Sequence, residues 1–104
     1  MDACERMLEM IMTWEQMFEA CKALEANICL RMRQPGDWYV EQSIEIKDGP
    51  FLGSIFGNGT MPQEAVEDHW RKLTELKPEQ YIVINARKDS RQAVKWNGYM
   101  WESV

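Results

Sequence analysis

The sequence predicts an α+β fold, a single domain in which two helices pack on one face of an antiparallel sheet in the order α-β-β-β-α-β-β-β. Two segments place apolar residues at three- and four-residue steps, the helical period, and several shorter segments alternate apolar and polar residues as strands do. Near the C-terminus, Asn97-Gly98 is the strongest short signal for a β-hairpin. At 104 residues the chain is long enough for one core and too short for two domains.

The first helix is predicted to run from about Trp14 to Ala26 with Thr13 as its N-cap, because Thr13 and Gln16 have the spacing of a capping box. The apolar stripe extends back toward the N-terminus and comprises Cys4, Met7, Leu8, Ile11, Trp14, Met17, Phe18, Cys21 and Leu24. Residues 1–12 are therefore an N-terminal extension or extra helical turns, and residues 13–104 form the domain. If the helix is continuous, its Met-rich end needs a partner, most simply a second copy in a homodimer.

Three strands follow, predicted over residues 28–33, 38–47 and 51–56 from their alternating apolar side chains. Two turns separate them, because Gln34-Pro35-Gly36-Asp37 and Lys47-Asp48-Gly49-Pro50 have strong turn chemistry. Gln42 interrupts the apolar face of the second strand, and Gly53 suits a bulge in the third.

The stretch Phe56-Gly57-Asn58-Gly59-Thr60 leads into the second helix. Thr60 is the expected N-cap, Gln63 completes a capping box, and the two glycines are expected to supply positive φ for a tight connection. The stretch lacks the Lys-Ser/Thr of a P-loop, so we expect its role to be architectural. The apolar stripe of this helix is Met61, Ala65, Val66, His69, Trp70, Leu73 and Leu76, which predicts that His69 is partly buried and hydrogen-bonded.

The chain closes with a strand at residues 81–86 and a hairpin whose two-residue loop would pair Trp96 with Tyr99 and Val94 with Trp101. The aromatic residues on one face of that ribbon are candidate protein-binding residues: Trp96, Tyr99 and Trp101. The cations beside them are candidate nucleic-acid-binding residues in an alternative interpretation: Arg87, Lys88, Arg91 and Lys95. A third interpretation also stays open, in which the aromatic residues pack under the sheet and the cations protect an edge strand.

Charge distribution favours a protein partner over nucleic acid. The net charge is −5, and residues 1–26 contribute −4 from six acids and two bases, which disfavours phosphate binding over the whole surface. The acids of the first helix are candidate protein-binding residues that could compete for a basic groove: Glu5, Glu9, Glu15 and Glu19. No constellation suited to acid–base, nucleophilic or metal chemistry is apparent, so we expect no enzyme, no cofactor and no metal site.

The N-terminal residues, the apolar runs and the cysteines predict the cellular compartment. Acids stand at the N-terminus where a secretory signal carries positive charge, and no apolar run approaches the roughly 18 residues of a membrane span. Three cysteines without a CxxC pair indicate reduced thiols. We expect a cytoplasmic protein that contacts no membrane.

Residues 13–77 resemble two known families through a strand, the GxGxT pattern and a helix beginning Pro62-Gln63-Glu64-Ala65. This part is similar to HicB-like antitoxins and, with the first helix, to double-stranded-RNA-binding domains, which implies a nucleic-acid-binding regulator or antitoxin as the alternative function. The second helix opens with acids where the RNA-binding family has lysines. The chain also looks like small accessory proteins of tailed phages and prophages. That resemblance implies a binding protein that inhibits or modulates a host protein, including nucleic-acid-handling defence factors such as those blocked by anti-CRISPR proteins.

Overall fold

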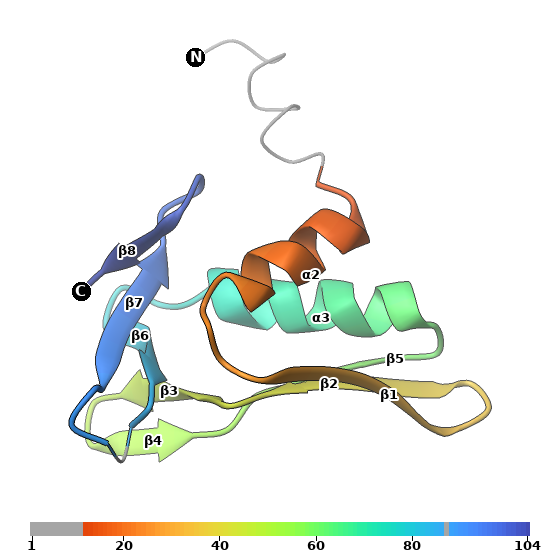
Figure 1. Cartoon of the computed structure of the whole chain (residues 1–104), viewed down its shortest axis with the longest axis horizontal. Helices are drawn as coiled ribbons and strands as arrows, with labels where there is room; N and C mark the ends of the chain where they lie inside the picture. The colour runs from red at the N-terminus through yellow and green to blue at the C-terminus, as the bar shows by residue number, and fades with distance from the viewer. Residues whose placement is uncertain (1–11, 87) are drawn as a thin grey trace, which may run out of the picture.

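The computed structural model describes residues 12–86 and 88–104. Within them, two helices and eight strands follow one another as α2 (Trp14–Lys22), β1 (Ile28–Gln34), β2 (Asp37–Gln42), β3 (Ile44–Asp48), β4 (Phe51–Gly53), β5 (Phe56–Gly59), α3 (Pro62–Thr74), β6 (Gln80–Ile84), β7 (Gln92–Trp96) and β8 (Trp101–Ser103) (Figure 1). All strand pairs are antiparallel, and the predicted α+β class is confirmed. Predictions for residues 1–11 lie outside the described residues.

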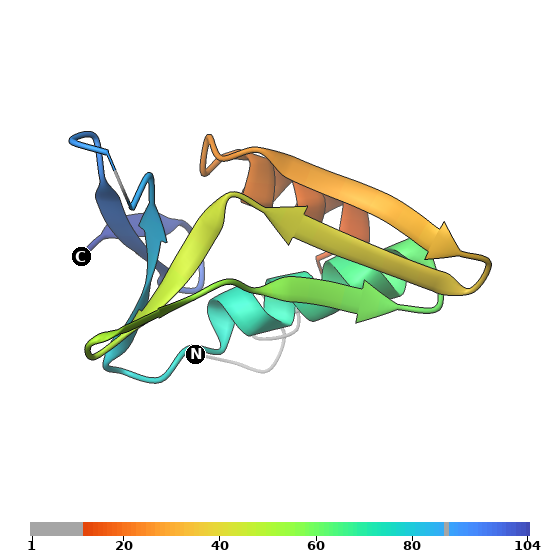
Figure 2. The same cartoon turned by 90° about the horizontal axis from the view of Figure 1, so that it is seen from below.

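The strands form two sheets, so the prediction of one sheet with six strands is wrong in that detail. One sheet has the order β1-β2-β5 and the other β4-β3-β6-β7-β8. The predicted strand 38–47 divides at Ser43, whose N–H donates to the carbonyl of Asn27 (2.8 Å). The predicted strand 51–56 likewise divides, into β4 and β5. Figure 2 shows the chain bending between β2 and β3. The chain therefore runs directly from one sheet into the other, although no described strand of one sheet pairs with a strand of the other.

Helix α2 begins as the sequence predicts. The Thr13 hydroxyl accepts from the Gln16 N–H (3.2 Å), and the Gln16 side-chain oxygen accepts from the Thr13 N–H (2.9 Å), which completes the capping box. The helix ends at Lys22, four residues before the predicted end at Ala26. Glu25 then adopts a left-handed conformation (φ 56°), which turns the chain toward β1.

Helix α3 lacks the capping box predicted for it. Its N-cap is Met61, which makes no side-chain capping bond, and Pro62 occupies the first turn as expected. Thr60 instead donates its N–H (2.8 Å) and its hydroxyl to the Glu64 carboxylate. These hydrogen bonds, the hydroxyl bond foremost, lower the pKa of Glu64 and hold a negative charge at the positive end of the helix dipole.

Gly57 and Gly59 are needed for close approach and not for positive φ, which corrects the sequence prediction. Neither has positive φ; both lie in β5 directly against α3. A Cβ on Gly57 would stand 2.2 Å from the Ala65 carbonyl oxygen, and one on Gly59 would stand 2.5 Å from Glu64 Cβ. The glycines therefore let a strand touch a helix backbone, and this contact positions α3.

The edge of β5 that does not pair with β2 is covered by two side chains of α3. The Asp68 carboxylate accepts from the Asn58 N–H (2.9 Å), and the Lys72 amine donates to the Phe56 carbonyl (2.7 Å). Asp68 and Lys72 are themselves an ion pair (2.8 Å). These bonds satisfy backbone groups that an open strand edge would offer to another chain.

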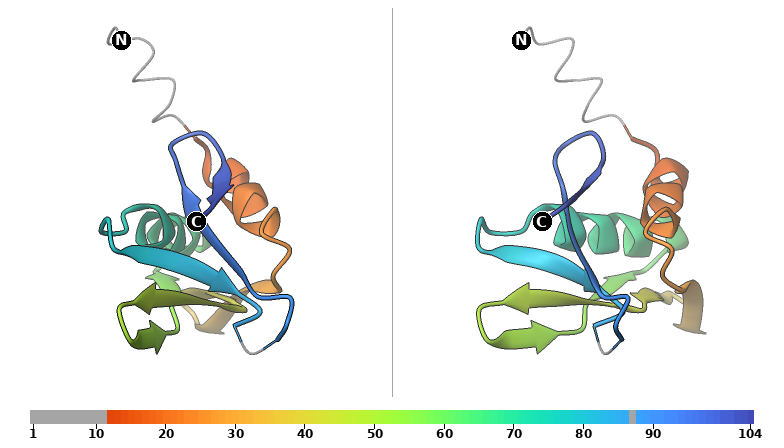
Figure 3. Two further views of the ribbon diagram at one scale, coloured as in Figure 1. Left: turned by 90° about the vertical axis from the view of Figure 1, so that its left-hand side faces the viewer. Right: turned by 60° about the vertical axis from the view of Figure 1, so that its left-hand side comes forward.

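The C-terminal hairpin has a four-residue loop where the sequence predicts two residues. Trp96 pairs with Trp101, and the Asn97 N–H donates to the Met100 carbonyl (3.1 Å), so the predicted pairing of Trp96 with Tyr99 is wrong. The Asn97 side-chain oxygen accepts from the N–H groups of Tyr99 and Met100, which stabilises the wider loop. Figure 3 shows this ribbon beside α2, where the Trp101 indole N–H donates to the Ala20 carbonyl (2.8 Å).

Candidate functional site

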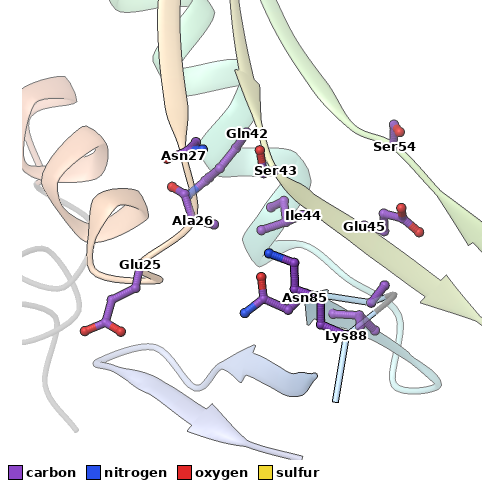
Figure 4. Close-up of a pocket in the computed structure, with 12 residues that line it drawn as sticks. Glu25, Ala26, Asn27, Gln42, Ser43, Ile44, Glu45, Ser54, Asn85 and Lys88 are labelled. Atoms are coloured by element: carbon purple, nitrogen blue, oxygen red, sulfur yellow. The ribbon is translucent and has the colours of Figure 1, made fainter. Parts of the chain in front are cut away.

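A polar depression lies where the two sheets part, bounded by the start of β1, the β2–β3 bend and the end of β6 (Figure 4). Its volume is about 440 Å³. Asn85 at its rim has a left-handed conformation (φ 56°), as Glu25 does. The Glu25 and Glu45 carboxylates extend to opposite sides in Figure 4 and do not form the close pair that acid–base chemistry uses. The depression is open and hydrophilic, with carboxylates that do not converge.

His69 lies in the core on the apolar face of α3, as predicted. It is 1% exposed, and its Nε2 lies 3.0 Å from the Gln42 side-chain oxygen. Gln42, also buried, donates its amide to the carbonyl of Cys21 at the end of α2 (2.7 Å). His69 Nδ1 has no hydrogen-bond partner among the described residues, so the predicted hydrogen bonding is present at one ring nitrogen only.

Burial sets the protonation state of His69. Desolvation, and secondarily the charge of Lys72, lower the pKa of His69 to about 4, although the Asp68 carboxylate acts in the opposite direction. The imidazole is therefore neutral at pH 7, with its Nε2–H donating to Gln42. The bridge joins α3, β2 and α2, which is a structural role.

The candidate aromatic residues separate into two environments. Trp96 and Trp101 face inward and meet Trp70 edge to face, with ring centroids 4.8 Å and 5.8 Å from that of Trp70. This is the arrangement of the third interpretation, in which the aromatic residues pack under the sheet. Tyr99 stands on the hairpin loop and is 66% exposed.

The described candidate cations have different surroundings. The Lys95 amine donates to the carbonyls of Lys77 (2.7 Å) and Pro78 (3.1 Å). Lys88 lines the polar depression, and Arg91 lines a neighbouring hollow on the outer face of the larger sheet; Val83 lines both. Arg87 lies outside the described residues.

The acids of the first helix are only partly described. Glu15 and Glu19 are exposed on α2, and Glu19 pairs with Lys22 (3.2 Å). Glu5 and Glu9, together with residues 1–11 of the Met-rich end proposed for dimerisation, lie outside the described residues.

A groove between α2 and α3, which the sequence does not predict as a site, combines apolar and acidic side chains. We call it the helical groove, and its volume is about 650 Å³. It is lined by Met12, Met17, Asn58, Gly59, Glu64, Glu67, Asp68, Trp70, Arg71, Thr74 and Glu75. Four acids and one base give this lining a net charge of −3. Acids on the outer side of an amphipathic helix are ordinarily solvated, so their spacing along α3 does not by itself indicate a site.

Residues 12–86 and 88–104 contain neither a cluster of metal ligands nor a helix that could span a membrane. No three His, Cys, Asp or Glu side chains there converge as metal ligands would. Neither described helix has the length and apolar character needed to cross a bilayer. Cys21 and Cys29 are free thiols, and burial raises the pKa of Cys21 to about 12.

No protein-family model matches the chain, and neither curated proteins nor solved structures yield a match.

Proposed function

We propose that this chain is a phage-encoded, non-catalytic binding protein that docks on a host protein in the bacterial cytoplasm and inhibits or modulates it. The observation that supports this most is the helical groove, in which two half-buried methionines and Trp70 lie beneath a rim of acids. An apolar centre with a polar rim is typical of protein interfaces.

The engagement of the reactive side chains also supports a binding role. His69 is buried and bonded to Gln42, and Asp68 is bonded to the β5 backbone and to two cations of its own helix. Groups held in this way serve the fold and are poorly placed to act on a substrate.

Affinity capture tests the proposal. The tagged chain, cross-linked in bacterial lysate, is expected to retain a defined protein, and the exposed charge-reversal variant E67K/E75K is expected to retain less of it. A chain that captures no protein while turning over a substrate in a metabolite screen would contradict the proposal. Light scattering of the free chain separately tests homodimerisation through its N-terminal residues.

A nucleic-acid-binding regulator or HicB-like antitoxin is the second candidate. It is favoured by one observation: Arg91, Lys47 and Tyr81 line the same hollow on the outer face of the larger sheet, which combines cations with an aromatic ring. Binding to single-stranded DNA or RNA at low salt, weakened by R91A/K47A, is expected for this function. The absence of any mobility shift at low salt would eliminate it.

A further inference from the structure

We propose that the helical groove binds a cationic amphipathic segment of the partner protein, with apolar side chains on the groove floor and lysines or arginines along its rim. This inference rests on the proposed function and names the chemistry of the partner.

The floor of the groove suits apolar side chains of varied shape. Met12 and Met17 are half-buried, and Trp70 is only 9% exposed, so the floor presents thioether and indole surface above a packed core. Methionine side chains are flexible and polarisable and can adjust to different apolar partners.

The rim carries acidic side chains along one side of α3. From Glu64 through Glu67 to Glu75 there are eleven residue steps along α3 and its C-cap, about 16.5 Å at 1.5 Å per residue. Asp68 and Arg71 pair with each other and cancel. Glu67 and Glu75 form no ion pair with another described residue, so their carboxylates are available to a partner.

The apolar floor and the acidic rim together favour one class of bound segment. The net −3 lining repels nucleic acid and acidic peptides, and a purely apolar segment would leave the rim charges without partners. Glu64 and Glu67 lie one turn apart and Glu75 lies about 12 Å further on, so they match a helix with cations one turn apart near one end, a further cation two turns away, and apolar residues between them.

Peptide titration tests the proposal with the full chain. The probe is a helical peptide of about 14 residues with leucines on one face and lysines beside them, compared with the same peptide carrying glutamates for lysines. The cationic peptide is expected to bind and the anionic one is not. E67Q/E75Q should weaken binding roughly 2- to 25-fold at low salt, whereas E15Q/E19Q, with the same change in charge on α2, should leave it within about twofold because neither residue lines the groove.

Several results would overturn the proposal. Equal weakening by E15Q/E19Q would assign binding to general acidity or to the outer face of α2. Binding that occurs only after residues 1–11 are removed would assign the groove to the chain itself, and a self-associated complex would assign it to a second copy. If the captured host protein is retained fully by E67Q/E75Q, this inference fails while the proposed function stands; if the intact chain captures nothing, the proposed function fails.

Discussion

Gly57→Ala should destabilise the fold strongly, because the new Cβ has no room between β5 and α3. It would stand 2.2 Å from the Ala65 carbonyl oxygen, 2.5 Å from His69 Cβ and 2.7 Å from His69 N. Carbon and oxygen rarely approach closer than about 3.3 Å, so strand and helix must separate by roughly 1 Å. Overpacking costs about 1–3 kcal/mol, and we expect about 3 kcal/mol here because two of the three clashes are with backbone atoms of α3. That corresponds to a fall in Tm of roughly 12–24 °C.

Gly53→Ala is the matched control. Gly53 also lies in a strand without positive φ, and its Cβ would meet nothing within 4 Å. Both substitutions reduce the entropy of the unfolded chain alike, by about 0.4–1 kcal/mol, so their difference isolates the clash. Urea unfolding followed by tryptophan fluorescence measures both free energies. If Gly57→Ala is within about 0.5 kcal/mol of Gly53→Ala, the account of the strand–helix contact is wrong.

Three further outcomes follow from individual contacts. The pKa of His69 in the folded chain lies below its usual value, so the unfolded chain binds a proton more readily. The free energy of unfolding should therefore fall by up to about 3 kcal/mol from pH 6.5 to 4. In urea unfolding at a series of pH values, His69→Gln should flatten this part of the profile. Asp68→Ala leaves the Asn58 N–H without its carboxylate and should cost about 1–3 kcal/mol in urea unfolding; no loss would mean that solvent replaces the bond fully. Trp101→Phe removes the hydrogen bond to the Ala20 carbonyl and should lower the free energy of unfolding by about 1 kcal/mol, and an unchanged Tm would argue against that bond.

Features encoded by neighbouring residues could be predicted from the sequence. The capping box of Thr13 and Gln16 formed as expected, and so did the two-residue turn at Pro35-Gly36, where Gly36 has φ +77°. In each case, the residues that give the sequence signal and form the local structure lie within four positions of one another. His69 was placed in the core because the helical period fixes which face of α3 is apolar.

Features that depend on distant partners could not be predicted in the same way. The break at Ser43 arises because the larger sheet pairs β3 with β6, almost forty residues later in the chain. The wider hairpin loop places Trp96 opposite Trp101, and both rings contact Trp70 on α3. A local sequence pattern does not indicate which distant strands or side chains will pair.

The helical groove escaped prediction for a related reason. Its floor combines Met12 and Met17 with Trp70 of α3, whereas its acidic rim comes from α3 and its C-cap. Alone, α2 and α3 are ordinary amphipathic helices, and only their packing brings methionines beneath acids. The same packing leaves Glu15 and Glu19, the acids predicted to bind a partner, outside the groove.

Methyl NMR of the full chain tests the binding account most directly. With ¹³C-methyl methionine, adding the cationic amphipathic peptide should shift the Met12 and Met17 signals and leave those of Met32 and Met100, which are 51% and 58% exposed and do not line the groove, unchanged. Shifts confined to Met32 or Met100, or no shift at saturating peptide, would contradict the account.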